Sequence, residues 1–448
     1  MHSISKRALI LLGLALSVAT AQAQKDSGGN AFSSDEWNDK TVFEHNKIYP
    51  RSNVTAFANE NAIEKGRYRE SPYFVSLAGD WHADVQADFH DRVDELEGKG
   101  FTGSAWPLVV LPNARVLGAN HTCPVPDNVY GISSKGNYTI TYWREFEVED
   151  DWEDYDAYLQ LRCKSAYYLW VNQQYVGFSE DSRTLSEFNI TKFLKFGKTN
   201  NVTLQVVSTS DGSLLEMGAD PSLCGVYDVA ISLKHAVNVQ DYSIKAAYNA
   251  KNKVGTFEID VNVANRTRKG KYYIEVELWN PNGKVIDKMG RWAFFDKRTE
   301  ATVSMDNQFS SILPWSAESP NLYTVVIRVL DKDMQLIESA GTRVGFRSLE
   351  MNDGRFLLNG RPVTLRGVVY ADYTQGADGI LSRERMLADV KMMKQNNINA
   401  VRTAYYSPID PYFYELCDEY GLYVIDEANC ESHGQGYDEQ SLAKKPEW

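Results

Sequence analysis

The residues best suited to chemistry in this chain lie between positions 421 and 436, in the stretch GLYVIDEANCESHGQG. It contains Asp426, Glu427, Glu431 and His433, whose carboxylates and imidazole can transfer protons or bind metal ions. They follow the apolar run 423–425, which predicts a short buried strand. Such a strand end is typical of an active-site rim, but a polar loop after a core strand would look the same. The surrounding elements have to distinguish these two interpretations.

Strands and helices alternate before this stretch. We expect strands at residues 363–369 and 400–404, with a helix after each. Ser382 is placed to cap the first helix, Asp410 to cap the second, and Gly421 to end the second before the last strand. Strand–helix repeats with short loops form parallel sheets, which bind ligands at the carboxyl ends of their strands. The acids described above occupy such an end, which favours the active-site interpretation.

The alternating region, residues 350–448, contains only these three strands. A closed barrel of this strand–helix type has about eight. An open parallel sheet leaves one edge unpaired and part of its surface uncovered, so it needs another element to cover it. We therefore expect the first three βα units of a (β/α)8 TIM barrel, in a truncated chain or gene fragment.

The chain before the barrel region is rich in short strands. Residues 71–234 include runs such as 138–148, in which aromatic and β-branched residues alternate with polar ones, and this predicts an antiparallel β-sandwich. Residues 235–349 hold a second set of strands with a turn at 280–283, which fits an immunoglobulin-like sandwich. Residues 24–70 are polar and irregular and are expected to form an extended arm over the first domain. The predicted fold class is multidomain β plus α/β.

Residues 1–23 differ in composition from the rest. Lys6 and Arg7 precede an apolar run, and Ala21-Gln-Ala23 offers a small-residue cleavage pattern. This predicts a bacterial secretory signal peptide, so the protein is expected in the periplasm or outside the cell. The apolar run is too short to cross about 30 Å of hydrocarbon, and no membrane span is expected elsewhere.

Charge and cysteine content restrict the partners. The net charge of −13 repels nucleic acid and anionic lipid, so neither is expected as a partner and a neutral substrate is favoured. The five cysteines lack CxxC spacing, so neither a zinc site nor a disulfide framework is indicated.

Three motifs carry a resemblance to a known family: VGFSEDSRTLSEFNI at 176–190, MKQNNINAVR at 393–402 and DEYGLYVIDEANCESHG at 418–434. From about Trp37 to its last residue, the chain resembles glycoside hydrolase family 2, specifically the large bacterial β-galactosidase branch. The resemblance implies a jelly-roll sugar-binding sandwich, an immunoglobulin-like domain and a catalytic TIM barrel. It also implies hydrolysis of terminal β-galactosides of oligo- or polysaccharides by a retaining mechanism, which needs two carboxyl groups about 5–5.5 Å apart. In the family both catalytic Glu residues lie on later barrel strands, so neither is expected before Trp448.

Supporting roles are implied for residues at the strand ends. Glu431 and His433 match the magnesium ligands of the family, whose third protein ligand is the later acid/base Glu. Because Mg²⁺ demands near-ideal octahedral coordination, two ligands from one loop form an incomplete site; from the residues alone, His433 is as well explained as a loop histidine bonded to a carboxylate. Arg402 matches an Arg that orients the nucleophile, although a salt bridge to Asp426 or Glu427 would also satisfy it.

Substrate contacts are implied for three further residues. Asn120 matches an Asn that reaches from the sandwich into the sugar subsite, or is a surface-turn Asn. Asp220 lies one residue out of register with an Asp that binds sugar and sodium. Tyr405 stands where a sugar-contacting His is expected.

Other positions depart from the family pattern. The His-rich segment after the first barrel strand is replaced by YADYTQ at 370–375, and the Arg usually found between Tyr227 and Asp228 is missing. Replacing histidines changes hydrogen-bonding reach and removes a pH-dependent charge. These departures leave open an alternative, a non-catalytic carbohydrate-binding protein or degenerate fragment. A homo-oligomer is also left open.

Overall fold

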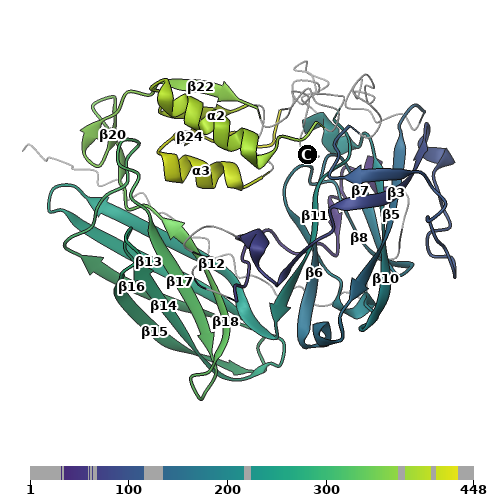
Figure 1. Cartoon of the computed structure of the whole chain (residues 1–448), viewed down its shortest axis with the longest axis horizontal. Helices are drawn as coiled ribbons and strands as arrows, with labels where there is room; N and C mark the ends of the chain where they lie inside the picture. Colours follow the sequence, from purple (N-terminus) through teal and green to yellow (C-terminus); the bar gives the residue numbers. More distant parts are fainter. Residues whose placement is uncertain are drawn as a thin grey trace, which may run out of the picture.

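The computed structural model describes residues 35–58, 68–115, 135–215, 223–371, 379–404 and 410–431, together with residues 32, 60 and 63. In this part, two antiparallel β-sandwiches lie side by side, and a small parallel α/β layer lies above the second of them (Figure 1). The predicted multidomain β plus α/β fold class is confirmed. Within the described residues, no helix is both long and apolar enough to cross a membrane.

The first sandwich consists of two sheets. In spatial order, the seven-stranded sheet contains β1 (Glu44–His45), β8 (Gln174–Ser179), β7 (Tyr167–Val171), β10 (Lys198–Val207), β5 (Thr139–Val148), β3 (Gly79–Gln86) and β4 (Leu108–Leu111). The facing sheet contains β2 (Phe74–Ser76), β11 (Val226–His235), β6 (Tyr155–Cys163) and β9 (Ser186–Asn189). Short 3-10 turns connect or flank these strands: η1 (Glu36–Asn38), η2 (Tyr68–Glu70), η3 (Phe89–Asp91), η4 (Asp150–Asp154), η5 (Thr191–Phe193) and η6 (Asp211–Leu215).

The core of the first sandwich follows from the alternation in its strands. Successive side chains of a strand point to opposite faces, so Val202, Leu204 and Val206 of β10 all enter the same buried cluster. Trp81 of β3 is buried there too, and its indole nitrogen donates to the Leu77 carbonyl at 2.8 Å. The apolar period of two therefore produces a core between two sheets.

The second sandwich is built in the same way from longer strands. One sheet contains β12 (Val237–Asn249), β13 (Val254–Asn265) and β16 (Glu300–Phe309). The other contains β15 (Val285–Asp296), β14 (Lys269–Trp279), β17 (Tyr323–Leu330) and β18 (Leu336–Val344). Alternate residues of β13, among them Phe257, Ile259 and Val261, fill its core.

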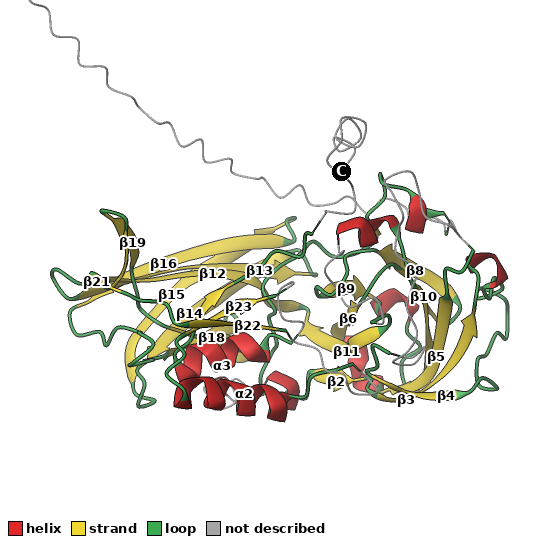
Figure 2. Ribbon diagram, turned by 90° about the horizontal axis from the view of Figure 1, so that it is seen from above, coloured by secondary structure: helices red, strands yellow, loops and turns green. Residues whose placement is uncertain are grey.

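A hairpin sheet then leads into the parallel layer. The hairpin contains β19 (Leu349–Asn352), β20 (Arg355–Leu358) and β21 (Arg361–Pro362). The parallel sheet contains β22 (Gly367–Tyr370), β23 (Ala400–Thr403) and β24 (Tyr423–Ile425), connected by α2 (Arg383–Gln395) and α3 (Tyr412–Tyr420). The two helices lie side by side along this sheet (Figure 2).

The predicted start of the first barrel strand is wrong. The prediction placed a strand at 363–369, whereas β22 begins at Gly367. The preceding residues are held by a side chain: the Asn399 amide donates to the Thr364 carbonyl at 3.0 Å, and the Arg366 amide donates to Asn399 Oδ1 at 2.7 Å. A side chain thus satisfies backbone groups that a strand neighbour would otherwise bind.

The caps at Ser382 and Gly421 are found at the expected residues, whereas α3 begins one residue later than predicted, with Pro411 as its N-cap. Ser382 Oγ accepts from the Arg385 amide at 3.2 Å, and Asp410 Oδ1 accepts from the Tyr412 amide at 3.0 Å. Gly421 ends α3 with φ of 78°, and a β-carbon there would lie 2.4 Å from the Ala317 carbonyl oxygen. Only glycine fits both the left-handed conformation and this close approach.

The arm, which we define as the described residues between 35 and 70, is held by charged contacts to several domains (purple in Figure 1). Arg51 Nε donates to Glu187 of the first sandwich at 2.9 Å. Glu60 binds Arg328 of the second sandwich through both of its carboxylate oxygens.

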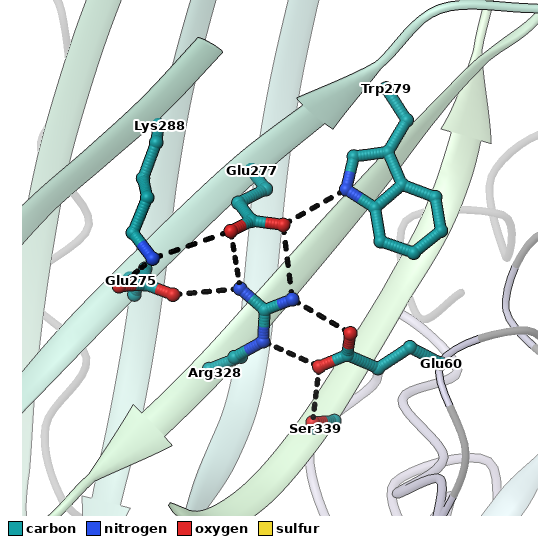
Figure 3. Close-up of polar contacts among 7 residues, drawn as sticks. All are labelled: Glu60, Glu275, Glu277, Trp279, Lys288, Arg328 and Ser339. Carbon is teal, nitrogen blue, oxygen red and sulfur yellow. Dashed lines mark hydrogen bonds and ion pairs between the residues drawn. The ribbon is translucent and has the colours of Figure 1, made fainter. Parts of the chain in front are cut away.

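Arg328 is the centre of the cluster in Figure 3. Its guanidinium also lies 2.7 Å from Glu275 and 2.9 Å from Glu277, and Lys288 lies 2.8 Å from Glu275. Hydrogen bonds from Arg328, and a further one from a neighbouring indole, hold the pKa of Glu277 at about 2. The arm is therefore bound to the outer face of the second sandwich by a network of both charge signs.

Candidate functional site

The carboxyl ends of β23 and β24 bring together an arginine and two acids. Arg402 at the end of β23 donates to Glu427 Oε1 at 2.6 Å. Thr403 Oγ1 accepts from the Glu427 amide at 3.0 Å and donates to Asp426 Oδ1 at 3.3 Å. Tyr414 of α3 donates to the same Asp426 oxygen at 2.5 Å. The parallel register of the strands places these side chains at one edge, as the sequence pattern predicted.

Glu431 connects this edge to the first sandwich. Its amide donates to the Leu215 carbonyl of η6 at 2.6 Å. The loop after β24 therefore meets the loop that follows β10. A pocket of about 300 Å³ lies at this meeting point, with Lys47, Asp181 and Asn429 in its wall. Its size is in the usual range for small-molecule sites.

Two buried carboxylates lie beside the same junction. Asp211 is the first residue of η6, and Glu180 directly follows β8. Burial raises the pKa of Asp211, and a hydrogen bond with Glu180 opposes that rise. A β-carbon at Gly212 would lie 3.3 Å from Glu180 Oε2, so the backbone approaches this carboxylate closely. The first sandwich thus brings its own acidic groups to the strand ends.

The structure describes only some of the predicted site residues. Arg402 and Glu431 both lie on the strand-end edge. The salt bridge from Arg402 to Glu427, one of the alternatives for this arginine, is present. Four other predicted residues lie outside the described residues: Asn120, Asp220, Tyr405 and His433.

Metal binding at this edge stays a prediction. Among the residues that the structure describes, no group of three or more His, Cys, Asp or Glu side chains has the arrangement of a metal site. Glu431 offers the hard oxygen ligand that Mg²⁺ prefers, and its predicted partner His433 is outside the described part.

Sequence reasoning missed a second set of residues between the first sandwich and the barrel region. Arg69 of the arm binds Asp228 of β11 through its two terminal guanidinium nitrogens, at 3.3 and 2.6 Å. Arg383 of α2 binds Asp410 through Nε and one terminal nitrogen, at 2.7 and 2.8 Å. The Tyr68 hydroxyl accepts from both arginines, at 3.3 Å from Arg69 and 2.9 Å from Arg383.

This joint includes one of the positions that depart from the family pattern. The Arg expected next to Asp228 is missing from the sequence, and the arm supplies Arg69 to the same carboxylate. Arg69 and Asp228 are 159 residues apart, and no motif in the sequence links them. Long-range pairing of this kind cannot be found from local spacing.

Family models match most of the chain, in the order of its three layers. They are the sugar-binding domain of glycosyl hydrolases family 2 at residues 113–236, the family 2 domain at 237–347 and the family 2 TIM barrel domain at 349–447. The chain belongs to glycosyl hydrolases family 2.

Curated relatives carry the name β-galactosidase. The chain is 32% identical over 437 residues to the β-galactosidase of Priestia megaterium, covering 92% of this chain and 42% of that protein. It is 37% identical over 326 residues to that of Streptococcus thermophilus, covering 71% of this chain and 31% of that protein. The chain therefore spans less than half the length of these relatives.

Solved structures share the fold. A β-glucuronidase from Bacteroides uniformis superposes with a TM-score of 0.68 at 19% identity, over 80% of this chain and 42% of that one. A family 2 member from Bacteroides cellulosilyticus gives a TM-score of 0.66 at 19% identity, over 80% and 48%. These likenesses show the architecture of a sugar-binding sandwich, an immunoglobulin-like sandwich and a barrel.

Proposed function

We propose that this chain is part of an exported glycoside hydrolase that removes terminal β-galactosides from oligo- or polysaccharides. The observation that carries the proposal is the contact between the Glu431 amide and the Leu215 carbonyl. It brings the sugar-binding sandwich to the carboxyl ends of the barrel strands, where barrel enzymes bind their substrates. The names of the sequence relatives support galactose as the sugar.

The reaction would follow the retaining mechanism, with one carboxyl group as acid/base and a second as nucleophile. We assign neither role to the acids at this edge. Asp426 and Glu427 are engaged by Tyr414, Thr403 and Arg402, and the family resemblance assigns both catalytic Glu residues to later strands. Arg402 would instead orient an acid on a neighbouring strand, by exchanging or sharing its bond to Glu427.

Glu431 and His433 would contribute to a magnesium site. Their carboxylate and imidazole would hold the ion at the strand ends, where its charge would stabilise an anionic catalytic carboxylate. Asp220 would contribute to sodium and sugar binding, and Asn120 and Tyr405 would contact the sugar. Loss of sugar affinity on chelation of divalent ions, restored by Mg²⁺, is the outcome expected of the magnesium assignment.

The second candidate is a carbohydrate-binding protein without turnover. It is favoured by the pair between Arg402 and Glu427, because a guanidinium that is already paired is less available to orient a catalytic acid. The substitution of a sugar-contacting His by Tyr405 points the same way.

Hydrolysis assays distinguish the two candidates. The polypeptide encoded by the complete reading frame should hydrolyse 4-nitrophenyl β-D-galactoside faster than the matching β-glucuronide or β-mannoside. Faster cleavage of the glucuronide would contradict the proposed substrate. Saturable galactose binding without cleavage of any of the three would favour the second candidate.

A further inference from the structure

A cavity of about 350 Å³ lies where the arm, the second sandwich and helix α3 meet. Its wall includes Asn53 and Thr55 of the arm, Tyr242 of β12 and Glu415 of α3. Cavities of about 300–1,000 Å³ at domain interfaces are the usual setting of small-molecule sites. The residues in its wall do not include Arg402 or any acid that follows β24, so it is distinct from the strand-end edge.

The polar groups in this wall are available to a ligand. Thr55 lines the cavity and is only 5% exposed. Ser52 Oγ donates to the Tyr242 carbonyl at 3.1 Å and keeps its lone pairs as acceptors. The Glu415 carboxyl lacks a hydrogen bond within the described part. Burial raises its pKa to about 7, and the charge of Arg343 opposes this rise. Perturbed titratable groups in a cavity are candidates for binding sites.

Part of the wall is apolar or aromatic. Phe57 and Ile63 of the arm are buried and line the cavity together with the ring of Tyr242. Aromatic rings together with hydroxyl, amide and carboxyl groups in one wall suit a molecule with a C–H face and several hydroxyls. Such a molecule can pack on the rings while its hydroxyls pair with Thr55 and Glu415.

Charge argues for a neutral ligand. Among the described residues of the wall, Arg343 is the only basic one, and it already lies 3.4 Å from Glu419. Asp418 and Glu415 contribute acidic groups to the same wall. An anion would therefore meet more negative than positive charge there.

We propose that this cavity is a second saccharide site, which binds a neutral hexose or the terminal hexose of an oligosaccharide between the arm, the second sandwich and α3. The hexose class follows from the wall, whereas the choice of galactose as the probe rests on the proposed function. A ligand held by all three parts binds the assembled arrangement in preference to an open one, so it stabilises the joint by linkage.

The test is a galactose titration of the purified chain, followed by calorimetry and by the thermal midpoint. A single hexose should bind with a Kd on the order of 1 mM, since ligands of this size rarely bind more tightly. Asn53→Trp places a large ring in the cavity from an exposed position and should abolish saturable binding. Glu415→Leu removes the carboxyl group and should weaken binding roughly tenfold to a hundredfold. Glu415→Gln, which keeps a hydrogen-bonding group of the same shape, should recover most of the affinity.

Matched controls separate this site from the strand-end edge and from folding defects. Glu384→Gln makes the same change of charge on exposed α2 and should leave the Kd unchanged. Unchanged circular dichroism of Asn53→Trp and Glu415→Gln would show that the variants fold.

Two outcomes overturn the inference. One is a wild-type chain that gives no saturable galactose signal, a result that says nothing against hydrolysis by the complete reading frame. The other is binding that survives Asn53→Trp and is lost in Arg402→Gln, which would place the sugar at the strand ends and support the proposed function instead.

Discussion

The first sandwich and the parallel sheet of β22–β24 are covered in different ways. In the first sandwich, two sheets face each other and share one core. In the parallel sheet, Val401 packs against α2 and α3, whereas the opposite face carries Val369, Arg402 and Ile425, which are 50% exposed or more. The sandwich can bury its strands alone, and the parallel sheet depends on what lies beside it.

The second sandwich supplies part of that support. Trp315 donates from its indole nitrogen to the Asp418 carbonyl at 2.8 Å and meets the ring of Tyr423 edge-on at 5.7 Å. Lys394 of α2 donates to the carbonyls of Ala317 and Gly421, at 2.9 and 2.8 Å. Hydrogen bonds from an indole and from an ammonium group, together with an aromatic pair, thus attach the parallel sheet to the second sandwich.

The largest expected effect is the loss of a core side chain in the first sandwich. Trp81→Ala should lower the free energy of unfolding by about 3–5 kcal/mol, because it removes a fully buried ring and leaves a cavity. Urea unfolding followed by circular dichroism measures this change.

The matched variant in the parallel sheet is Phe413→Ala, which removes a buried ring stacked on Tyr370 at 4.2 Å. Hydrogen exchange should accelerate in α2, α3 and β22–β24 and stay unchanged in the first sandwich. Equal acceleration in both regions would show that they unfold as one unit and would remove the distinction between them.

The next effect is expected at the joint between the two sandwiches, where the free energy of unfolding should depend on pH. Glu338 of β18 is buried and accepts from the Val239 amide at 3.0 Å; burial raises its pKa to about 7, while Lys234 opposes the rise. The folded state then holds a proton that the unfolded state releases above about pH 4.5. Stability from this group therefore falls between about pH 4.5 and 7, by roughly 1 kcal/mol per pH unit.

Glu338→Gln should remove this slope. Urea midpoints at pH 5, 6, 7 and 8 should fall less steeply in the variant than in the wild type, and the variant should be the more stable of the two at pH 8. The charged side chain that faces this carboxyl, Lys234, and the backbone amides of Val239 and His235 that bond to it stay in place in both proteins. Parallel curves for the two proteins would contradict a proton held by Glu338.

A smaller effect is expected at the joint between the second sandwich and the parallel sheet. Trp315→Phe keeps the ring packing but removes the hydrogen bond to Asp418, which should cost about 1 kcal/mol. Hydrogen exchange in α3 should speed up roughly fivefold, with the sandwiches unaffected. Trp292→Phe on the exposed face of β15 is the matched control and should change neither quantity.

The contrast between the sandwiches and the parallel sheet also explains which parts of the fold the sequence could predict. Local patterns were sufficient for the sandwiches, because a period of two decides which side chains enter a core, as in Val202 and Leu204. They were also sufficient for helix ends such as Ser382 and Gly421, whose capping chemistry is local. They failed at residues 363–366, where a side chain distant in sequence, Asn399, binds the backbone.

The candidate site likewise contains residues that the sequence predicted and contacts that it did not. The acids after β24 were predicted because strand order alone puts them at one edge. The contact of Glu431 with Leu215 and the pair of Arg69 with Asp228 join segments more than a hundred residues apart, and no local pattern specifies such partners. Family resemblance supplied roles for the edge, but the arm that positions the domains had no motif to reveal it.

The smallest effect on stability is expected at the open face of the parallel sheet. Arg402→Gln breaks the bond to Glu427, but both side chains are partly exposed, so the free energy of unfolding should change by less than about 1 kcal/mol. Arg385→Gln, which removes an arginine that is 65% exposed from its pair with Asp389, is the matched control and should have a similarly small effect. If Arg402 instead orients groups for sugar chemistry, hydrolysis by the complete reading frame should fall at least tenfold in Arg402→Gln and stay unchanged in Arg385→Gln, a difference of about 1.4 kcal/mol in transition-state stabilisation. Equal activity in both variants would reduce Arg402 to one half of a surface ion pair without a chemical role.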